Sequence, residues 1–216
     1  ETPKADVVNS GKFASILINE IKNDTWYEKA SGNKIEIKAK EGRIVVASEA
    51  VLNEVVVAEG GEKVKVEVEG KLTNLLVKAE TKLDVNVKGK LDSLDLANKS
   101  EVNLTSEGTV SKVNIQAAAK LNIKGKQEKI ELEIKKEAKG SSITTEVPVD
   151  LKTSAEVSVT LEKGAEGSKI EALEKEAEVK LENNTKEKVE VKTPEGTKQV
   201  ESNNSQTAPI GGGYSG

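Results

Sequence analysis

The stretch GKLTNLLVKAETKLDVNVK (70–88) sets a pattern that returns in GKLDSLDLANKSEVNLTSE (89–107) and in GTVSKVNIQAAAKLNIK (108–124). Each segment opens on a glycine, and Gly70, Gly89 and Gly108 are 19 residues apart. Behind each glycine, aliphatic residues occupy equivalent positions. Self-similarity at a fixed period of this length is typical of repeat architectures.

The 19-residue spacing extends far beyond these three segments. A second register of aliphatic residues fails at Gly140 and resumes at Val159; it runs through Val45, Val64, Leu83, Val102 and Leu121. The longest register meets only Val, Ile or Leu over ten positions, namely Ile18, Ile37, Val56, Leu75, Leu94, Val113, Leu132, Leu151, Ile170 and Val189. The repeat is therefore expected to include most of the chain.

Within each repeat, apolar and polar residues alternate, as in KVKVEVE (63–69), KLDVNVK (82–88) and EVNLTSE (101–107). This alternation predicts short β-strands with one face buried, and Gly-containing turns follow them. One unit cannot bury its own inner face, whereas stacked units bury a continuous aliphatic column. The sequence therefore predicts an all-β, parallel β-solenoid with about 19 residues per coil.

Two alternatives concern the geometry of this stack. An antiparallel single-layer β-meander would need two turn signals per period, such as Asn-Gly or Asp-Gly, and neither dipeptide occurs in the chain. A left-handed solenoid usually shows a strict six-residue repeat, which is absent here, so a right-handed β-helix is favoured. Outward positions should then form ladders between coils, and two are expected: Asp84, Asn103 and Asn122, and Glu133, Lys152 and Glu171.

The two ends of the chain depart from the pattern. We expect residues 1–34 to form an N-terminal cap or an irregular first coil, residues 35–192 the solenoid, and residues 193–216 a flexible Gly/Ser/Asn-rich linker to further domains of the same polypeptide. In the first segment Phe13, Leu17, Ile21 and Trp26 have a loosely helical spacing, which suits a short amphipathic cap. The register at Ile18 instead favours an irregular coil.

Composition excludes several functions. The chain has no His and no Cys, so disulfides, thiolate sites and histidine metal sites are excluded, and we expect no metal and no cofactor. Its 33 basic and 37 acidic residues are interspersed, which predicts no nucleic-acid surface. No apolar run is long enough to insert directly into a membrane.

Catalytic machinery is not expected either. Paired carboxylates need burial or mutual proximity to act as acid and base, whereas the acidic residues here fall at outward strand positions and in turns. The sole arginine, Arg43, begins a strand and is expected at the surface. There are only six aspartates: Asp6, Asp24, Asp84, Asp92, Asp95 and Asp150.

Trp26 and Tyr27 are the only candidates for ligand binding. If exposed, their rings would stack on sugars. If buried, they would plug the N-terminal end of the aliphatic column, and this is favoured because the aromatics gather where a cap is needed.

The glycine-led repeat followed by a second alternating strand resembles the β-helical repeat regions of bacterial cell-surface proteins. These occur in Gram-positive proteins with S-layer-homology anchoring modules, and a Gly-rich segment such as GGGYSG (211–216) often follows them. The chain is also similar to bactofilins, whose short β-helices polymerise, although its longer coil fits them poorly. The surface-protein resemblance implies an extracellular location, in the cell wall or S-layer, and a structural or adhesive role.

The expected function is therefore that of a non-enzymatic stalk or spacer in a surface protein. One alternative is a module that binds a cell-wall or plant polysaccharide, through a flat strand face or through Trp26 and Tyr27. Another is a self-polymerising scaffold in which coil ends stack between molecules. A polysaccharide lyase or hydrolase is the least favoured reading.

Overall fold

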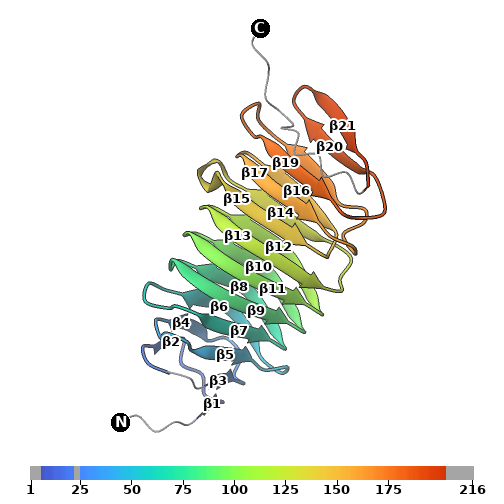
Figure 1. Cartoon of the computed structure of the whole chain (residues 1–216). Helices are drawn as coiled ribbons and strands as arrows, with labels where there is room; N and C mark the ends of the chain where they lie inside the picture. The colour runs from blue at the N-terminus through green and yellow to red at the C-terminus, as the bar shows by residue number, and fades with distance from the viewer. Residues whose placement is uncertain (1–5, 22–24, 203–216) are drawn as a thin grey trace.

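The computed structural model describes residues 6–21 and 25–202, and these form a parallel β-solenoid of about ten coils (Figure 1). Each coil contributes one strand to each of two sheets, and the chain rises through both sheets from the N-terminal to the C-terminal end. The predicted fold class is confirmed, and the antiparallel meander is wrong because all pairings but one are parallel.

Sheet A contains the odd-numbered strands up to β19. In spatial order they are β1 (Val7–Asn9), β3 (Thr25–Glu28), β5 (Arg43–Val46), β7 (Val64–Val68), β9 (Thr81–Val87), β11 (Ser100–Ser106), β13 (Ala119–Gly125), β15 (Ser141–Thr145), β17 (Val157–Leu161) and β19 (Val179–Asn183).

Sheet B contains the even-numbered strands and ends on β21. In spatial order they are β2 (Ser15–Ile18), β4 (Lys34–Ile37), β6 (Val51–Val57), β8 (Lys71–Val77), β10 (Lys90–Leu96), β12 (Thr109–Ile115), β14 (Ile130–Ile134), β16 (Val149–Thr153), β18 (Lys169–Ala172), β20 (Val189–Thr193) and β21 (Gly196–Val200). The only helix among the described residues is the short 3-10 turn η1 (Lys136–Ala138).

The core is an aliphatic column between the two sheets. Inward residues of successive coils stack directly, as in Leu75, Leu94 and Val113, and each of these three side chains is fully buried. Neighbouring strands in a sheet lie about 4.8 Å apart, so each aliphatic side chain contacts its equivalents above and below. This stacking supplies apolar contact without aromatic residues.

The repeat glycines allow coils to approach closely at one corner. A Cβ added at Gly89 would lie 2.0 Å from the carbonyl oxygen of Gly70, and one at Gly108 would lie 2.1 Å from that of Gly89. No side chain fits at such distances. The 19-residue glycine period is therefore a packing requirement of the stack.

The longest aliphatic register is a single stack from Leu75 to Ile170 and fails on both sides of it. Ile18 and Ile37 lie instead in the stack of Val77. Ile37 pairs with Val57, so Val56 lies on the opposite face of β6. At the far end Ile170 pairs with Val191 in place of Val189. In both places the coil is longer than 19 residues, and each extra residue shifts the register.

The second register also breaks where a coil is longer than 19 residues. Val64, Leu83, Val102 and Leu121 pair in succession, whereas Val45 lies beside Glu67 on the outer side. Ile143 takes the place that Gly140 would hold, because the turn containing η1 lengthens that coil. An insertion thus explains the apparent gap in the repeat.

Both ends differ from their expected boundaries. The strands β2 and β3 pair in parallel with strands of the next coil, so neither belongs to a helical cap. The expected linker from residue 193 is wrong at its start, because β21 turns back and pairs antiparallel with β20. Residues 203–216, which contain the rest of that segment, lie outside the described residues.

Candidate interaction surfaces

Trp26 and Tyr27 project to opposite sides of β3. Trp26 is stacked with Ile44 and packs, partly buried, against the core, while Tyr27 lies beside Val45 on the outer side. Successive side chains of a strand point to opposite faces, so the two rings do not form a common platform for a sugar.

Next to Trp26 lies a buried carboxyl group that the sequence analysis did not identify. Glu28 is fully buried, and its oxygens accept hydrogen bonds from Asn9 Nδ2 (2.9 and 3.0 Å), the backbone N–H of Ala30 (2.9 Å), Trp26 Nε1 (3.2 Å) and Asn33 Nδ2 (3.3 Å). Buried polar groups are costly unless they are paired, and here several donors satisfy one carboxyl group. Asn9 and Glu28 are 19 residues apart, and this spacing was the one sequence signal for the cluster.

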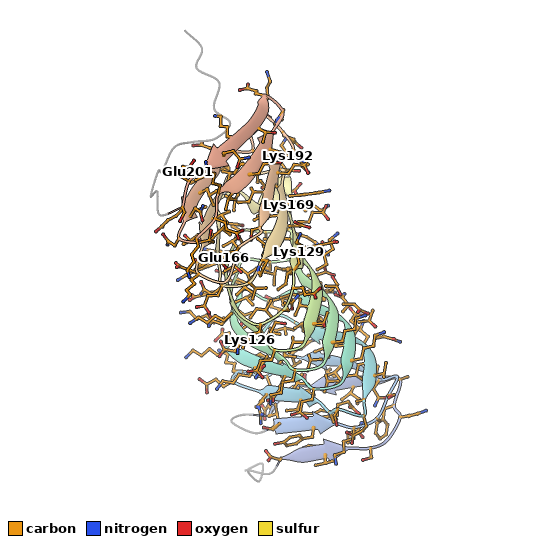
Figure 2. All side chains as sticks on the ribbon, turned by 90° about the vertical axis from the view of Figure 1, so that its right-hand side faces the viewer. Lys126, Lys129, Glu166, Lys169, Lys192 and Glu201 are labelled. Carbon is orange, nitrogen blue, oxygen red and sulfur yellow. The ribbon has the colours of Figure 1, made fainter. Side chains whose placement is uncertain are left out.

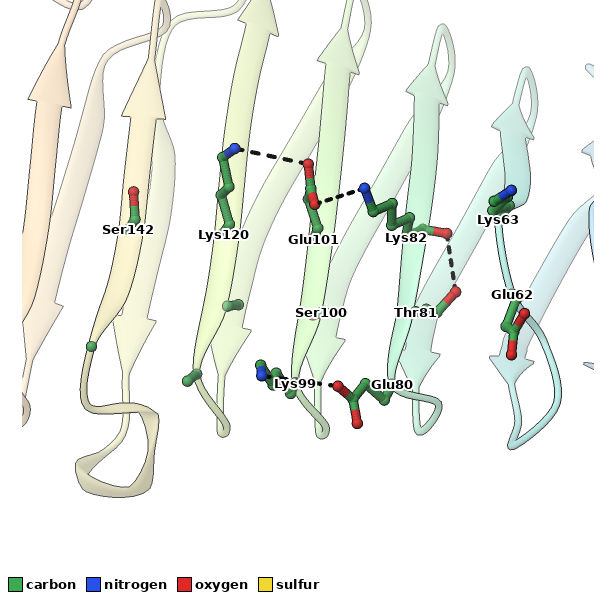
Figure 3. Close-up of a pocket in the computed structure, with 13 residues that line it drawn as sticks. Glu62, Lys63, Glu80, Thr81, Lys82, Lys99, Ser100, Glu101, Lys120 and Ser142 are labelled. Atoms are coloured by element: carbon green, nitrogen blue, oxygen red, sulfur yellow. Dashed lines mark hydrogen bonds and ion pairs between the residues drawn. The ribbon is translucent and has the colours of Figure 1, made fainter.

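A groove of about 530 Å³ follows the corner where the strands of sheet A begin (Figure 3). Its floor is made of small residues, Thr81, Ser100 and Ala119, which stack on one another. Along one rim Glu101 bridges Lys82 (3.3 Å) and Lys120 (3.8 Å), as the dashed lines in Figure 3 show. The charges of this rim are paired within the protein itself.

The outer face of sheet B carries a second hollow, of about 430 Å³, lined by alternating acidic and basic residues. The predicted ladder of Glu133, Lys152 and Glu171 is confirmed by the strand register. Figure 2 shows how charged side chains cover the solenoid, with Lys129, Lys169 and Lys192 following one another along one side. Charge alternation of this kind stabilises neighbouring coils by a few tenths of a kcal/mol per pair.

Several charged groups with shifted pKa values belong to ladders of this type. Hydrogen bonds from Lys112 and Lys135 lower the pKa of Glu133 to about 2, and Lys112 Nζ lies 2.7 Å from Glu133. On sheet A, hydrogen bonds from Lys88 and Arg43 lower the pKa of Glu67. Arg43 lies at the surface, as expected, and its guanidinium pairs there with Glu67 of the next coil.

The aspartates are dispersed along the solenoid. Asp84 accepts a hydrogen bond from Asn103 (2.9 Å), which in turn accepts one from Asn122 (3.1 Å), so the predicted polar ladder is confirmed. Asp92 pairs with Lys90 and Asp150 with Lys129. Asp24 lies outside the described residues.

Within residues 6–21 and 25–202 no group of three or more acidic side chains is placed to hold a metal ion. In the same part of the chain no helix has the length and apolar character needed to cross a bilayer.

A comparison with protein families gives one match. The model described as adenylate cyclase associated (CAP) C terminal matches residues 25–163, which is more than half of the chain and extends from β3 into the segment after β17. No curated protein and no solved structure matches the chain. The matched family differs from the surface proteins that the repeat pattern resembles, and no finding supports an S-layer setting.

Proposed function

Because the chain belongs to the family of adenylate cyclase associated (CAP) C-terminal domains, we propose that it is a non-enzymatic structural module that holds its two ends a fixed distance apart. The observation that carries this proposal is the unbroken parallel pairing of ten strands in sheet A and of ten in sheet B before β21. We also propose that the module lies at a cell surface and that further domains are attached to it.

The mechanism is geometric. Bending the rod would require backbone hydrogen bonds between coils to lengthen on one side while the aliphatic column is compressed on the other. Each coil contacts only its neighbours, so every interface between two coils resists bending, and no long loop is needed. Side-chain bridges between coils, such as Arg43–Glu67 and Lys88–Glu67, add to this continuity at the surface.

The test is a distance measurement between two spin labels. The chain has no cysteine, so Lys29→Cys in the turn after β3 and Glu182→Cys in β19 place one label near each end. Strand spacing predicts a separation on the order of 40 Å with a narrow distribution. A broad distribution, or one that changes when further domains are attached, would overturn the spacer function.

A second candidate function is binding of a polysaccharide along the corner groove, which the continuity of that groove over several coils favours. The paired rim charges offer polar contacts, while Ala118 and Ala119 offer apolar surface. Co-sedimentation with insoluble polysaccharides tests this function. Loss of binding in Ala119→Lys, with binding retained in Leu173→Lys, would support it, and absence of binding to every polymer would exclude it.

A further inference from the structure

The two sheets of the solenoid present different outer faces on the same coils. On sheet B, the outward side chains of β16 and β18 are all charged, namely Asp150, Lys152, Lys169 and Glu171. On sheet A, the outward side chains of β15 and β17 all carry hydroxyl groups, namely Ser142, Thr144, Ser158 and Thr160. This uncharged block belongs to a chain in which 32% of the residues are charged, so the two faces suit different contacts.

The four hydroxyl residues stack into two rows that follow the solenoid axis. Ser142 lies beside Ser158, and Thr144 lies beside Thr160, in the parallel register of β15 and β17. The inward hydroxyl of Ser141, in the same strand, donates to a backbone carbonyl at 2.6 Å. Among the described residues, by contrast, none of the four outward hydroxyl groups has a hydrogen-bond partner. They remain able to donate to a ligand and to accept from it.

An amide ladder extends one of these rows. Asn122 pairs with Thr144 and Asn103 pairs with Asn122, so both asparagines continue the threonine row. Asn122 Nδ2 donates to Asn103 Oδ1 (3.1 Å), which fixes the orientation of the Asn122 amide. The strands β11, β13, β15 and β17 are thus joined by an uncharged surface about 14 Å long, at about 4.8 Å per strand spacing. We call it the neutral patch, and it consists of Asn103, Asn122, Ser142, Thr144, Ser158 and Thr160.

The lysines that border the neutral patch are already paired with glutamates. The pairs join neighbouring coils, and their N–O distances are 3.8 Å for Lys120–Glu101, 3.9 Å for Lys124–Glu146 and 2.9 Å for Lys180–Glu156. A charged partner would therefore have to compete with these glutamates for a counter-charge. An uncharged partner needs no counter-charge and meets only hydroxyl and amide groups.

We propose that the neutral patch binds an uncharged polysaccharide whose chain follows the solenoid axis. Sugar hydroxyls donate and accept hydrogen bonds, and so do the hydroxyls of serine and threonine and the amides of asparagine. A polymer with a repeating unit meets equivalent groups on successive strands, so several weak contacts act together. Because these side chains stand on a hydrogen-bonded sheet, little further ordering of the protein opposes binding.

The proposal deepens the second candidate function and rests on its class of ligand, but it moves the site. Ser142 also lines the last coil of the corner groove, beside the strand of Lys120 in Figure 3, so the groove and the neutral patch are neighbours. The other five residues of the patch do not line the groove. Substitutions can therefore tell the two sites apart.

Affinity electrophoresis of the full chain in native gels tests the proposal. The gels contain hydroxyethyl cellulose, galactomannan or glycol chitin, which are uncharged, or the anionic carboxymethyl cellulose. We expect at least one uncharged polymer to retard the protein, and carboxymethyl cellulose to retard it less. Thr144→Glu combined with Thr160→Lys should raise the dissociation constant at least tenfold. This variant places two opposite charges side by side in the threonine row, which sheets tolerate, and keeps the net charge.

The matched control changes the other face of the same coils. Lys152→Thr combined with Glu171→Thr removes two neighbouring, opposite charges from sheet B, again at constant net charge. It should leave the retardation unchanged. Far-UV circular dichroism should show that both variants remain folded.

Three results would overturn the neutral patch as a binding site. One is retardation by none of the uncharged polymers, and another is strongest retardation by carboxymethyl cellulose. The third is equal retardation of the Thr144/Thr160 variant and the unaltered protein. If Ala119→Lys then abolished binding, the polymer would lie in the corner groove, and the second candidate function would stand without the patch. The spacer function is independent of all three results, since the distance between spin labels is measured without polymer.

Discussion

Single residues matter most where a polar group lies inside the aliphatic stack. Glu28 is fully buried and receives hydrogen bonds from side chains of Asn9, Trp26 and Asn33. It joins the first coil to the second through contacts that no aliphatic residue could make. The same contacts fix the loop that exposes Phe13.

We predict that Glu28→Gln destabilises the N-terminal coils. In the variant, the side-chain NH2 group of glutamine takes the place of one carboxylate oxygen and faces the donors that now bind this oxygen. A buried donor without an acceptor costs about 1–3 kcal/mol. Chemical unfolding followed through the single tryptophan measures this loss. Glu20→Gln, an exposed carboxyl group of the same end, is the control and should leave the midpoint unchanged. Equal stability of both variants would contradict the structural role of Glu28.

Glu133 should make stability depend on pH. Its folded-state pKa of about 2 lies below the ordinary 4.5, so its pairing with Lys112 and Lys135 is fully present above pH 4.5 and is lost as the pH falls toward 2. Because the pair is partly exposed, Glu133→Gln should lower the free energy of unfolding at pH 7 by less than about 1 kcal/mol. The difference from the unaltered protein should vanish near pH 2.

Urea unfolding at several pH values measures this effect. Glu128→Gln removes an exposed carboxyl group from the turn before β14 and should show no such pH dependence. A difference at pH 2 as large as at pH 7 would show that Glu133 acts through packing and not through its charge.

At the scale of strands and corners, two buried threonines in the second half of the solenoid bind the backbone where strands end. Thr145 Oγ1 donates to the Val147 carbonyl (2.7 Å) and accepts from the Val147 N–H (3.0 Å). Thr153 does the same with Ala155, at 2.6 and 3.1 Å. Both threonines are fully buried and turn the chain at the end of a strand.

Thr153→Val should therefore destabilise the protein, although the valine side chain has nearly the same shape as that of threonine. It leaves the N–H and the carbonyl of Ala155 without their partner in the buried corner, at a cost of about 1–3 kcal/mol. Thr153→Ser keeps the hydroxyl and should recover most of the stability. Thermal unfolding of the two variants measures the difference, and equal melting temperatures would contradict a hydrogen-bonding role.

The strands were predictable because their signal is local and periodic. KLDVNVK (82–88) alternates, and β9 (Thr81–Val87) is where this pattern places a strand. Coil insertions were not predictable, since a lengthened turn such as the one at η1 leaves no mark except a broken register at Gly140. The cluster around Glu28 was missed because its residues are far apart in the sequence and only the 19-residue spacing of Asn9 and Glu28 marks it.

At the scale of the whole molecule, the repeat makes the structure nearly one-dimensional. Each coil is bounded by its two neighbours, and its stability comes from intrinsic terms and interface terms. Coils of equal length are then interchangeable as long as the register is kept. The central coils, which begin at Gly70, Gly89 and Gly108, meet this condition.

We predict that deleting residues 89–107 leaves a folded, shorter solenoid. The deletion joins Lys88 to Gly108, so that Leu72, Leu75 and Val77 stack on Val110, Val113 and Ile115 in the register that β10 now mediates. The distance between labels at positions 29 and 182 should fall by about 4.8 Å, the spacing of one strand. Lys82 would then lie beside Lys120, a like-charge contact that costs only a few tenths of a kcal/mol.

Deleting ten residues, 89–98, is the contrasting variant. It removes fewer residues than the deletion of 89–107. It nevertheless breaks the 19-residue register, because strand segments of sheet A would then lie opposite those of sheet B. Because a strand out of register turns its apolar face to solvent, this smaller deletion should cost far more stability than the larger one. If both deletions were equally harmful, the coils would not be independent units, and the stiffness of the rod would depend on features particular to each coil.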